Sequence, residues 1–137
     1  MKYNMSNIQS WPHFAALEKF ASSITEAIDR KWKADGFTHN EPPQVRIGSI
    51  GPRYIRLRRF EKDRSGVLKA TSSYCSVDLT DGSVWKDSWK AVVNNGKRGN
   101  LNDAGILTKA GVYGLQYLTG GNYESVARIL QADLLHA

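Results

Sequence analysis

The sequence predicts an α+β fold in which a long N-terminal helix packs on an antiparallel β-meander of about four strands, with a C-terminal helix after it. Three observations support this prediction. Apolar residues recur at helical spacing over residues 11–35, apolar and polar residues alternate within residues 44–90, and an Asp81-Gly82 pair typical of tight hairpins lies inside that second region. The 137 residues suit a single domain with one core.

Residues 11–35 are expected to form the N-terminal helix because their apolar side chains recur at spacings of three and four. This stripe consists of Phe14, Leu17, Ala21, Ile24 and Ile28. Ser10 suits the N-cap, Pro12 is tolerated in the first turn, and Gly36 suits the C-terminal stop. Beyond Gly36, Glu41-Pro42-Pro43 cannot continue a helix and is expected to link it to the meander.

The meander is predicted over residues 44–90, where the period of the pattern changes to two. Its turns are expected at Gly51-Pro52, in the polar stretch Lys62–Gly66, and at Asp81-Gly82, because these residues tolerate turn conformations. The expected strands begin at Val45, at Arg53, at Val67 and at Val84.

The second of these strands, Arg53–Phe60, is rich in arginine and has two different faces. Ile55, Leu57 and Arg59 share one face, because alternate side chains of a strand point the same way. The other face carries Tyr54, Arg56, Arg58 and Phe60. Both faces compete for the long helix. We expect Ile55 and Leu57 to face the core, which leaves the arginines and their aromatic neighbours pointing outward.

The pattern weakens in a glycine-rich region over residues 94–121, which is expected to be mostly loop. Within it, Asn94–Asp103 is predicted to be a long loop with Lys97-Arg98 at its centre, while Gly111–Leu118 fits either a strand or a short helix. A final helix is predicted over residues 122–135. Its apolar face would consist of Tyr123, Val126, Ala127, Leu130 and Leu134.

The composition favours a polyanionic partner in a reducing compartment. Nineteen basic residues oppose thirteen acidic ones, which gives a net charge of +6. The single Cys75 excludes an intramolecular disulfide framework, and we expect it to be a buried, inert side chain. No apolar run approaches the ~20 residues that span a bilayer, and the first ten residues lack a signal-peptide core. We therefore predict a cytoplasmic protein that does not bind membranes.

Catalytic and metal-binding signals are weak. His13, His39 and His136 are not at metal-ligand spacing, and no nucleophile elbow, phosphate-binding loop or zinc-protease motif occurs. Asp78 and Asp81 flank a hairpin, where carboxylates usually serve turn geometry. We predict no catalytic residue, metal or cofactor, and keep an enzyme assembled from distant residues as the third-ranked alternative.

Nucleic-acid binding, non-sequence-specific and single-stranded rather than duplex, is the leading functional prediction. Arginine pairs with phosphate through its planar guanidinium group, and aromatic rings stack on unpaired bases. The alternative is that Arg56 and Arg58 are an ordinary solvated face, with Tyr54 and Phe60 packed beneath the helix. The predicted binding residues are Arg53, Tyr54, Arg56, Arg58, Phe60, Lys62, Arg64, Lys86, Trp89, Lys90, Lys97 and Arg98.

A protein-interaction role is the second prediction. Trp85 and Trp89 lie on one face in either a strand or a helix, so they could anchor a partner, although core packing is the favoured explanation for the pair. The basic residues would then steer toward an acidic host or phage protein. An exposed edge strand would also allow pairing into a homodimer.

Four short motifs resemble those of a family of small uncharacterised bacteriophage proteins. These are V-D-x-T-x-G at Val77–Gly82, S-W-K-A at Ser88–Ala91, R-G-N at Arg98–Asn100, and a Y-G pair at Tyr113-Gly114. The resemblance covers residues 74–118, about a third of the chain. It implies an origin in a phage or a phage-infected host, and it implies no activity.

Overall fold

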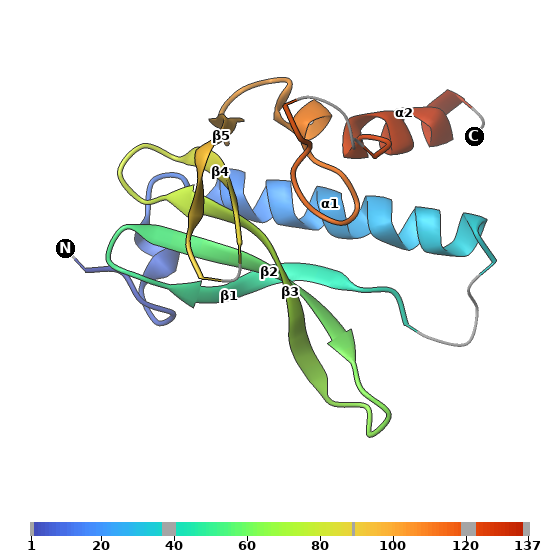
Figure 1. Cartoon of the computed structure of the whole chain (residues 1–137), viewed down its shortest axis with the longest axis horizontal. Helices are drawn as coiled ribbons and strands as arrows, with labels where there is room; N and C mark the ends of the chain where they lie inside the picture. The colour runs from blue at the N-terminus through green and yellow to red at the C-terminus, as the bar shows by residue number, and fades with distance from the viewer. Residues whose placement is uncertain (1, 37–40, 89, 119–122, 136–137) are drawn as a thin grey trace.

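The computed structural model describes residues 2–36, 41–88, 90–118 and 123–135, and it confirms an α+β fold (Figure 1). A helix is followed by a five-stranded antiparallel sheet in the order β1-β2-β3-β4-β5, which is one strand more than predicted, and by a short C-terminal helix. The elements are η1 (Ile8–Ser10), α1 (Phe14–Ala34), β1 (Gln44–Ile50), β2 (Tyr54–Lys62), β3 (Leu68–Asp78), β4 (Ser83–Asp87), β5 (Val92–Asn100), η2 (Ile106–Lys109) and α2 (Val126–Leu135).

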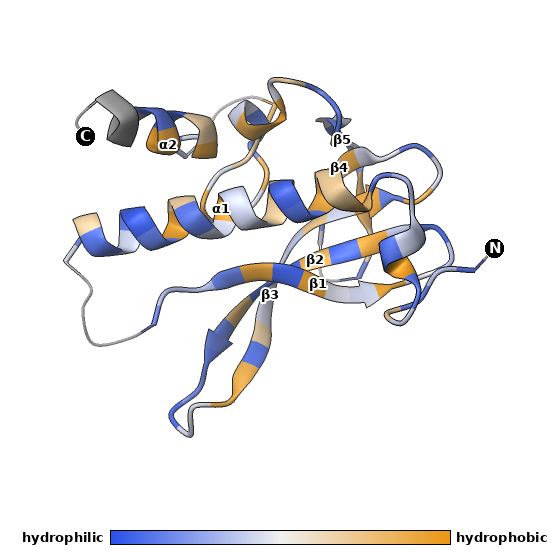
Figure 2. Cartoon of the chain, turned by 180° about the vertical axis from the view of Figure 1, so that it is seen from behind, coloured by the Kyte–Doolittle hydropathy of each residue, from blue (hydrophilic) through white to orange (hydrophobic). Residues whose placement is uncertain are grey.

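Helix α1 is amphipathic, as predicted, and Figure 2 shows hydrophilic and hydrophobic bands along its length. It begins at Phe14 rather than at residue 11, and its N-cap is His13 rather than Ser10. The chain is held before the helix starts, because Trp11 is buried and donates its indole N–H to the carbonyl of Leu79 at 3.0 Å. The buried face of α1 consists of Leu17, Phe20, Ile24, Ala27 and Ile28.

Strand β2 places its apolar face in the core, which confirms that part of the prediction. Ile55 and Leu57 are both completely buried. They pair with Val77 and Cys75 on β3, which are also buried, so the centre of the sheet is one apolar surface. Burial of a large apolar side chain of this kind stabilises the fold by roughly 1.5–3 kcal/mol.

The hairpin of β4 and β5 runs steeply across the direction of β1 and β2 (Figure 1). The prediction that residues 94–103 form a long loop is wrong, because β5 extends to Asn100 and pairs with β4 along most of its length. Its asparagines and glycines have poor strand propensity, but an existing neighbouring strand overrides propensity. Gly96 fits the close backbone approach, because a Cβ there would lie 2.6 Å from the carbonyl oxygen of Lys86.

The segment between β5 and α2 closes the end of the core. Gly111–Leu118 forms neither a regular strand nor a helix: Ala110 pairs with Leu115 in an isolated bridge. The buried Tyr74 of β3 donates its hydroxyl to the carbonyl of Gly111 at 2.6 Å and holds this loop against the sheet. Helix α2 begins at Val126 rather than at residue 122, so Tyr123 precedes it and is exposed.

None of the helices in the described parts of the chain is long and apolar enough to cross a membrane.

Candidate functional site

The arginines at the start of β2 are bound to carboxylates of the same molecule. The Nε atom of Arg53 lies 3.1 Å from Asp78, whose side chain is buried, and this hydrogen bond raises the pKa of Arg53 above its ordinary value. The Nη1 atom of Arg56 lies 3.3 Å from Asp87, whose side chain has no exposed surface. Two arginines predicted to bind phosphate therefore already have anionic partners.

Asp87 is the centre of this arrangement. It lies on β4 and accepts hydrogen bonds from the hydroxyls of Ser73 and Ser76 on β3 as well as from Arg56. A buried carboxylate needs such partners because burial without them is costly. These bonds fasten the β4–β5 hairpin against the outer face of β2 and β3. The prediction that this face is open to solvent is therefore wrong at Arg56, whose side chain is only 22% exposed.

The rest of the predicted β2 face is half-buried and divided. The guanidinium carbon of Arg53 lies over the ring of Tyr54, 5.2 Å from the centroid of that ring. The aliphatic stem of Arg58 covers Gly48, where an added Cβ would lie 2.5 Å from its Cδ. Phe60 lies on the same face as Arg58 and lines a groove beside α1. Each of these side chains is partly covered by its neighbours, so the face is not an open platform of arginines and rings.

The other predicted residues are dispersed. Lys62 forms an ion pair with Glu41 at 2.9 Å, and Arg64 and Lys90 are exposed elsewhere on the surface. Lys97 is exposed on β5. Trp89 lies outside the described residues, so the proposed tryptophan pair is not described, although Trp85 is half-buried and donates its indole N–H to Ser83 at 2.8 Å.

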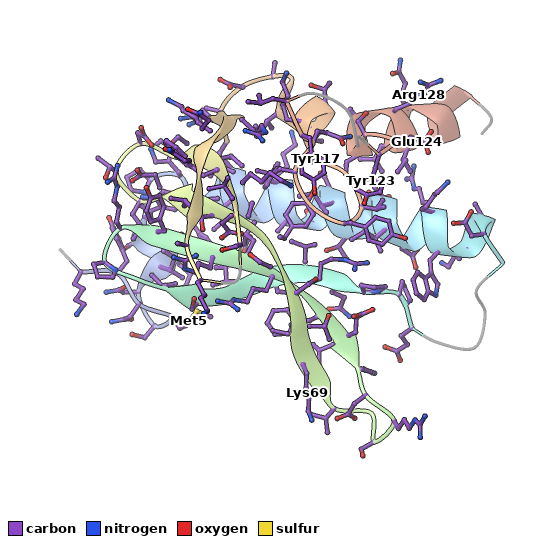
Figure 3. The ribbon with its side chains drawn as sticks, viewed as in Figure 1. Met5, Lys69, Tyr117, Tyr123, Glu124 and Arg128 are labelled. Atoms are coloured by element: carbon purple, nitrogen blue, oxygen red, sulfur yellow. The ribbon has the colours of Figure 1, made fainter. Side chains whose placement is uncertain are left out.

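A different cluster does combine positive charge with exposed aromatic rings, and we call it the tyrosine patch. It consists of Tyr113, Tyr117, Tyr123, Arg59, Lys86 and Arg98. The three tyrosines come from the segment between β5 and α2 and are 49–56% exposed. Figure 3 labels Tyr117 and Tyr123 on this segment, beside the start of α2. Single exposed rings are ordinary, but rings that gather into one patch can mark an interaction site.

Lys86 and Arg98 hold one end of the patch. The Nζ atom of Lys86 lies 4.1 Å from the centroid of the Tyr117 ring and donates a hydrogen bond to the carbonyl of Leu115 at 2.9 Å. Arg98 donates its Nε–H to the carbonyl of Gln116 at 2.7 Å. Strands β4 and β5 thus place two predicted binding residues beside a tyrosine that the sequence analysis did not select.

The electrostatics of this end favour an added anion. Burial, together with the nearby guanidinium group of Arg98, holds the pKa of Lys86 below its ordinary value. Among the residues that the structure describes, neither Lys86 nor Arg98 has a carboxylate within ion-pair distance. A phosphate between them would relieve the repulsion of the two cations.

Arg59 and two tyrosines hold the other end. The guanidinium carbon of Arg59 lies 5.0 Å from the centroid of the Tyr113 ring. The rings of Tyr113 and Tyr123 pack against each other, with their centroids 5.0 Å apart. The Nε atom of Arg59 is buried and has no hydrogen-bond partner in the described structure. Gln116 joins the two ends, because its side-chain amide bonds to the backbone N–H and carbonyl of Tyr123.

A small hollow of about 280 Å³ adjoins the Tyr117 end. Arg98, Lys109 and Tyr117 line it, together with the hydroxyl-bearing Thr108. Such a hollow is large enough for a phosphate group and carries the cations that would neutralise one.

The described residues contain no group of three or more histidines, cysteines or acidic side chains that could hold a metal ion. Cys75 is buried, as predicted, and burial raises the pKa of its thiol well above the ordinary value. The carboxylates of Asp78 and Asp81 accept backbone N–H bonds from Thr80 and Ser83, which are the turn contacts that the sequence predicted.

Comparisons of the chain with protein-family models, with curated proteins and with solved structures found no match. The bacteriophage resemblance of residues 74–118 therefore stays a prediction.

Sequence reasoning selected Lys86 and Arg98 but missed Arg59 and the three tyrosines. One signal was available for two of them: Tyr113 and Tyr117 lie in a segment that has no clear helical or strand period, so no core face accounts for them, whereas Tyr123 was assigned to the apolar face of the final helix. Their meeting with β4 and β5 depends on the fold of the loop and has no signature in the sequence.

Proposed function

We propose that this protein binds single-stranded nucleic acid, without sequence specificity, through the tyrosine patch. The observation that carries the proposal is the pairing of half-exposed tyrosine rings with cations that form no ion pair with any described carboxylate: Tyr113 with Arg59, and Tyr117 with Lys86. Aromatic rings stack on unpaired bases of any type, while the cations neutralise phosphates. The net charge of +6 attracts the strand over a longer range.

Single strands fit this surface better than a duplex. The bases of a duplex are stacked on one another and expose only their edges in the grooves. Tyrosine side chains on a loop therefore could not stack on the faces of those bases. The patch is built on a short irregular loop rather than on a helix or β-ribbon of the kind that enters a major groove. The phage-type origin implied by the sequence resemblance is compatible with this activity and does not support it further.

The direct test is a titration of fluorescent single-stranded and duplex oligonucleotides of equal length, followed by anisotropy at about 50 mM and about 200 mM salt. With three phosphate contacts, one for each cation of the patch, at a slope of about 0.7 each, the affinity for the single strand should fall roughly 20-fold between these concentrations. The single strand should bind more tightly than the duplex. Absence of binding to the single strand at low salt and micromolar protein overturns the proposal.

The aromatic contribution is tested by Tyr117→Ala, with Tyr117→Phe as the matched control. Loss of a stacked ring should cost about 1–3 kcal/mol of binding free energy, whereas phenylalanine keeps the ring and should bind almost as well as the native protein. Equal affinity of the two variants would show that the ring of Tyr117 does not contact the strand.

A further inference from the structure

The outer edge of β1 borders a groove of about 920 Å³ that separates this strand from the N-terminal half of α1. β1 and α1 run beside one another, as seen from the front in Figure 1 and from behind in Figure 2. The α1 wall includes Phe14, Ser22 and Thr25. Met5, which is 59% exposed and is labelled in Figure 3, lies at the end near the N-terminus.

The groove follows the edge of β1 rather than one face of the sheet. Val45 and Ile47 point to the core side, and Gln44 and Arg46 point to the opposite side, because alternate side chains of a strand diverge. Residues of both sets line the groove. A space that touches both faces of an edge strand has the position that a sixth strand would take.

The backbone of β1 is partly paired along this edge. The hydroxyl of Thr25 accepts a hydrogen bond from the N–H of Val45 at 3.0 Å and donates one to its carbonyl at 3.4 Å. Both groups of Val45 therefore point away from β2, toward α1. Backbone direction repeats every second residue up to the β-bulge after Ile47, so the N–H and carbonyl of Ile47 point into the groove as well. In the described sheet β1 pairs with β2 alone, so an added strand would pair at Ile47, next to the groups of Val45 that Thr25 already occupies.

The charges of the groove indicate what kind of strand fits. Arg46 and Lys19 are exposed at its rim and form no ion pair with any residue that the structure describes. Glu18 is the one acidic residue among the groove-lining residues. An added strand would place one set of side chains beside Val45 and Ile47 and the other set beside Arg46. The matching sequence alternates apolar with acidic residues.

We propose that the β1 edge groove binds an extended peptide segment of a partner protein, with apolar and acidic residues in alternation, as an additional antiparallel strand. Strand addition to an exposed sheet edge is a common way in which proteins recognise peptides. This binding site is separate from the tyrosine patch, and the proposal does not rest on nucleic-acid binding.

A second copy of this chain is a poorer occupant of the same groove. Pairing β1 with β1 of another molecule would bring two Arg46 side chains and two Lys19 side chains to one interface. Like charges that face each other across paired strands are destabilising. Both proteins would also carry a net charge of +6, which opposes their association.

The probe for the test is a short fluorescein-labelled peptide that alternates valine and glutamate, titrated with the full chain and followed by anisotropy. Two control peptides separate the contributions: one replaces every glutamate with lysine, and one carries N-methyl groups on its central amides, which removes backbone donors. We expect each control to bind at least tenfold more weakly. No binding of the acidic peptide, or equal binding of all three peptides, overturns the proposal.

Protein variants locate the site. Ser22→Trp should fill the groove and lower the affinity for the acidic peptide at least tenfold. Ala34→Trp, at an exposed position on the same helix outside the groove, should leave that affinity unchanged. Arg46→Glu, which keeps α1 intact, should reverse the preference between the acidic and the basic peptide. Unchanged preference in Arg46→Glu, or a dimer in light scattering that Ser22→Trp abolishes, contradicts the peptide proposal.

Discussion

Arg56 on β2 and Asp87 on β4 form an ion pair at 3.3 Å although 31 residues separate them in the sequence. The pair explains why the arginine-rich strand does not present a free cationic face. It also shows how the β4–β5 hairpin is held: Ser73 and Ser76 complete the hydrogen bonding of the same carboxylate. A surface predicted for binding is thus largely a structural contact, and the cations available for a ligand are Lys86 and Arg98 on the hairpin together with Arg59 farther along β2.

Asp87→Asn should destabilise the fold by about 2–4 kcal/mol, because it removes the charge that Arg56 faces and disturbs the acceptor of two hydroxyls. Urea unfolding followed by tryptophan fluorescence measures the change. Asp63→Asn is the control, since Asp63 pairs with the exposed Lys69 in a surface turn. A midpoint shift no larger than that of Asp63→Asn would show that the buried cluster does not hold the hairpin.

Thr25→Val should cost about 1–2 kcal/mol of unfolding free energy, because it keeps the shape of the side chain but leaves the N–H and carbonyl of Val45 without their partner. The matched control is Thr71→Val, whose hydroxyl bonds at an exposed site. Hydrogen exchange should also accelerate at the Val45 amide. Unchanged protection of that amide would contradict the role given to Thr25.

Tyr74→Phe should loosen the loop that carries the tyrosine patch. The variant removes the buried hydroxyl that bonds to the carbonyl of Gly111 and should destabilise the fold by about 1–2 kcal/mol. Hydrogen exchange should rise in residues 110–117 more than in α1. If exchange rises equally throughout, the hydroxyl supports the whole core and has no particular effect on the loop.

Stability should fall in acid partly through Asp81. Hydrogen bonds from the side chain and backbone of Ser83 hold the pKa of Asp81 below its ordinary value of 3.8. The stabilising contribution of this carboxylate is therefore fully present above 3.8 and is lost as pH falls through the lower folded-state pKa. Asp81→Asn should show a smaller decline in melting temperature between pH 5 and pH 2 than the native protein, and an identical decline would contradict the assignment.

The parts of the fold that follow from local pattern were predictable. The stripe of α1, the apolar face of β2 and the Asp81-Gly82 turn each depend on a few neighbouring residues, and Gly82 indeed has a positive φ of 78°. β5 was missed because its residues are poor strand formers that become a strand only through pairing with β4.

The candidate site was predictable to a lesser degree. The sequence shows that Arg56 is basic but not that Asp87 neutralises it, because ion pairs between distant residues depend on tertiary structure. Likewise Lys86 and Arg98 could be selected by charge, whereas Tyr117 joins them only because the loop after η2 returns to the β4–β5 hairpin.

The central claim is that the tyrosine patch, rather than the overall positive charge, binds single strands. Its most direct test compares Lys86→Gln/Arg98→Gln with Lys62→Gln/Lys69→Gln, since both variants lose two positive charges but Lys62 and Lys69 are already paired with Glu41 and Asp63. The measurement is single-strand affinity against salt concentration. We predict that Lys86→Gln/Arg98→Gln binds the single strand at least tenfold more weakly, and that the slope of log affinity against log salt concentration becomes shallower by about 1.4. The affinity and slope of Lys62→Gln/Lys69→Gln should change little. Equal effects of the two variants would contradict the claim.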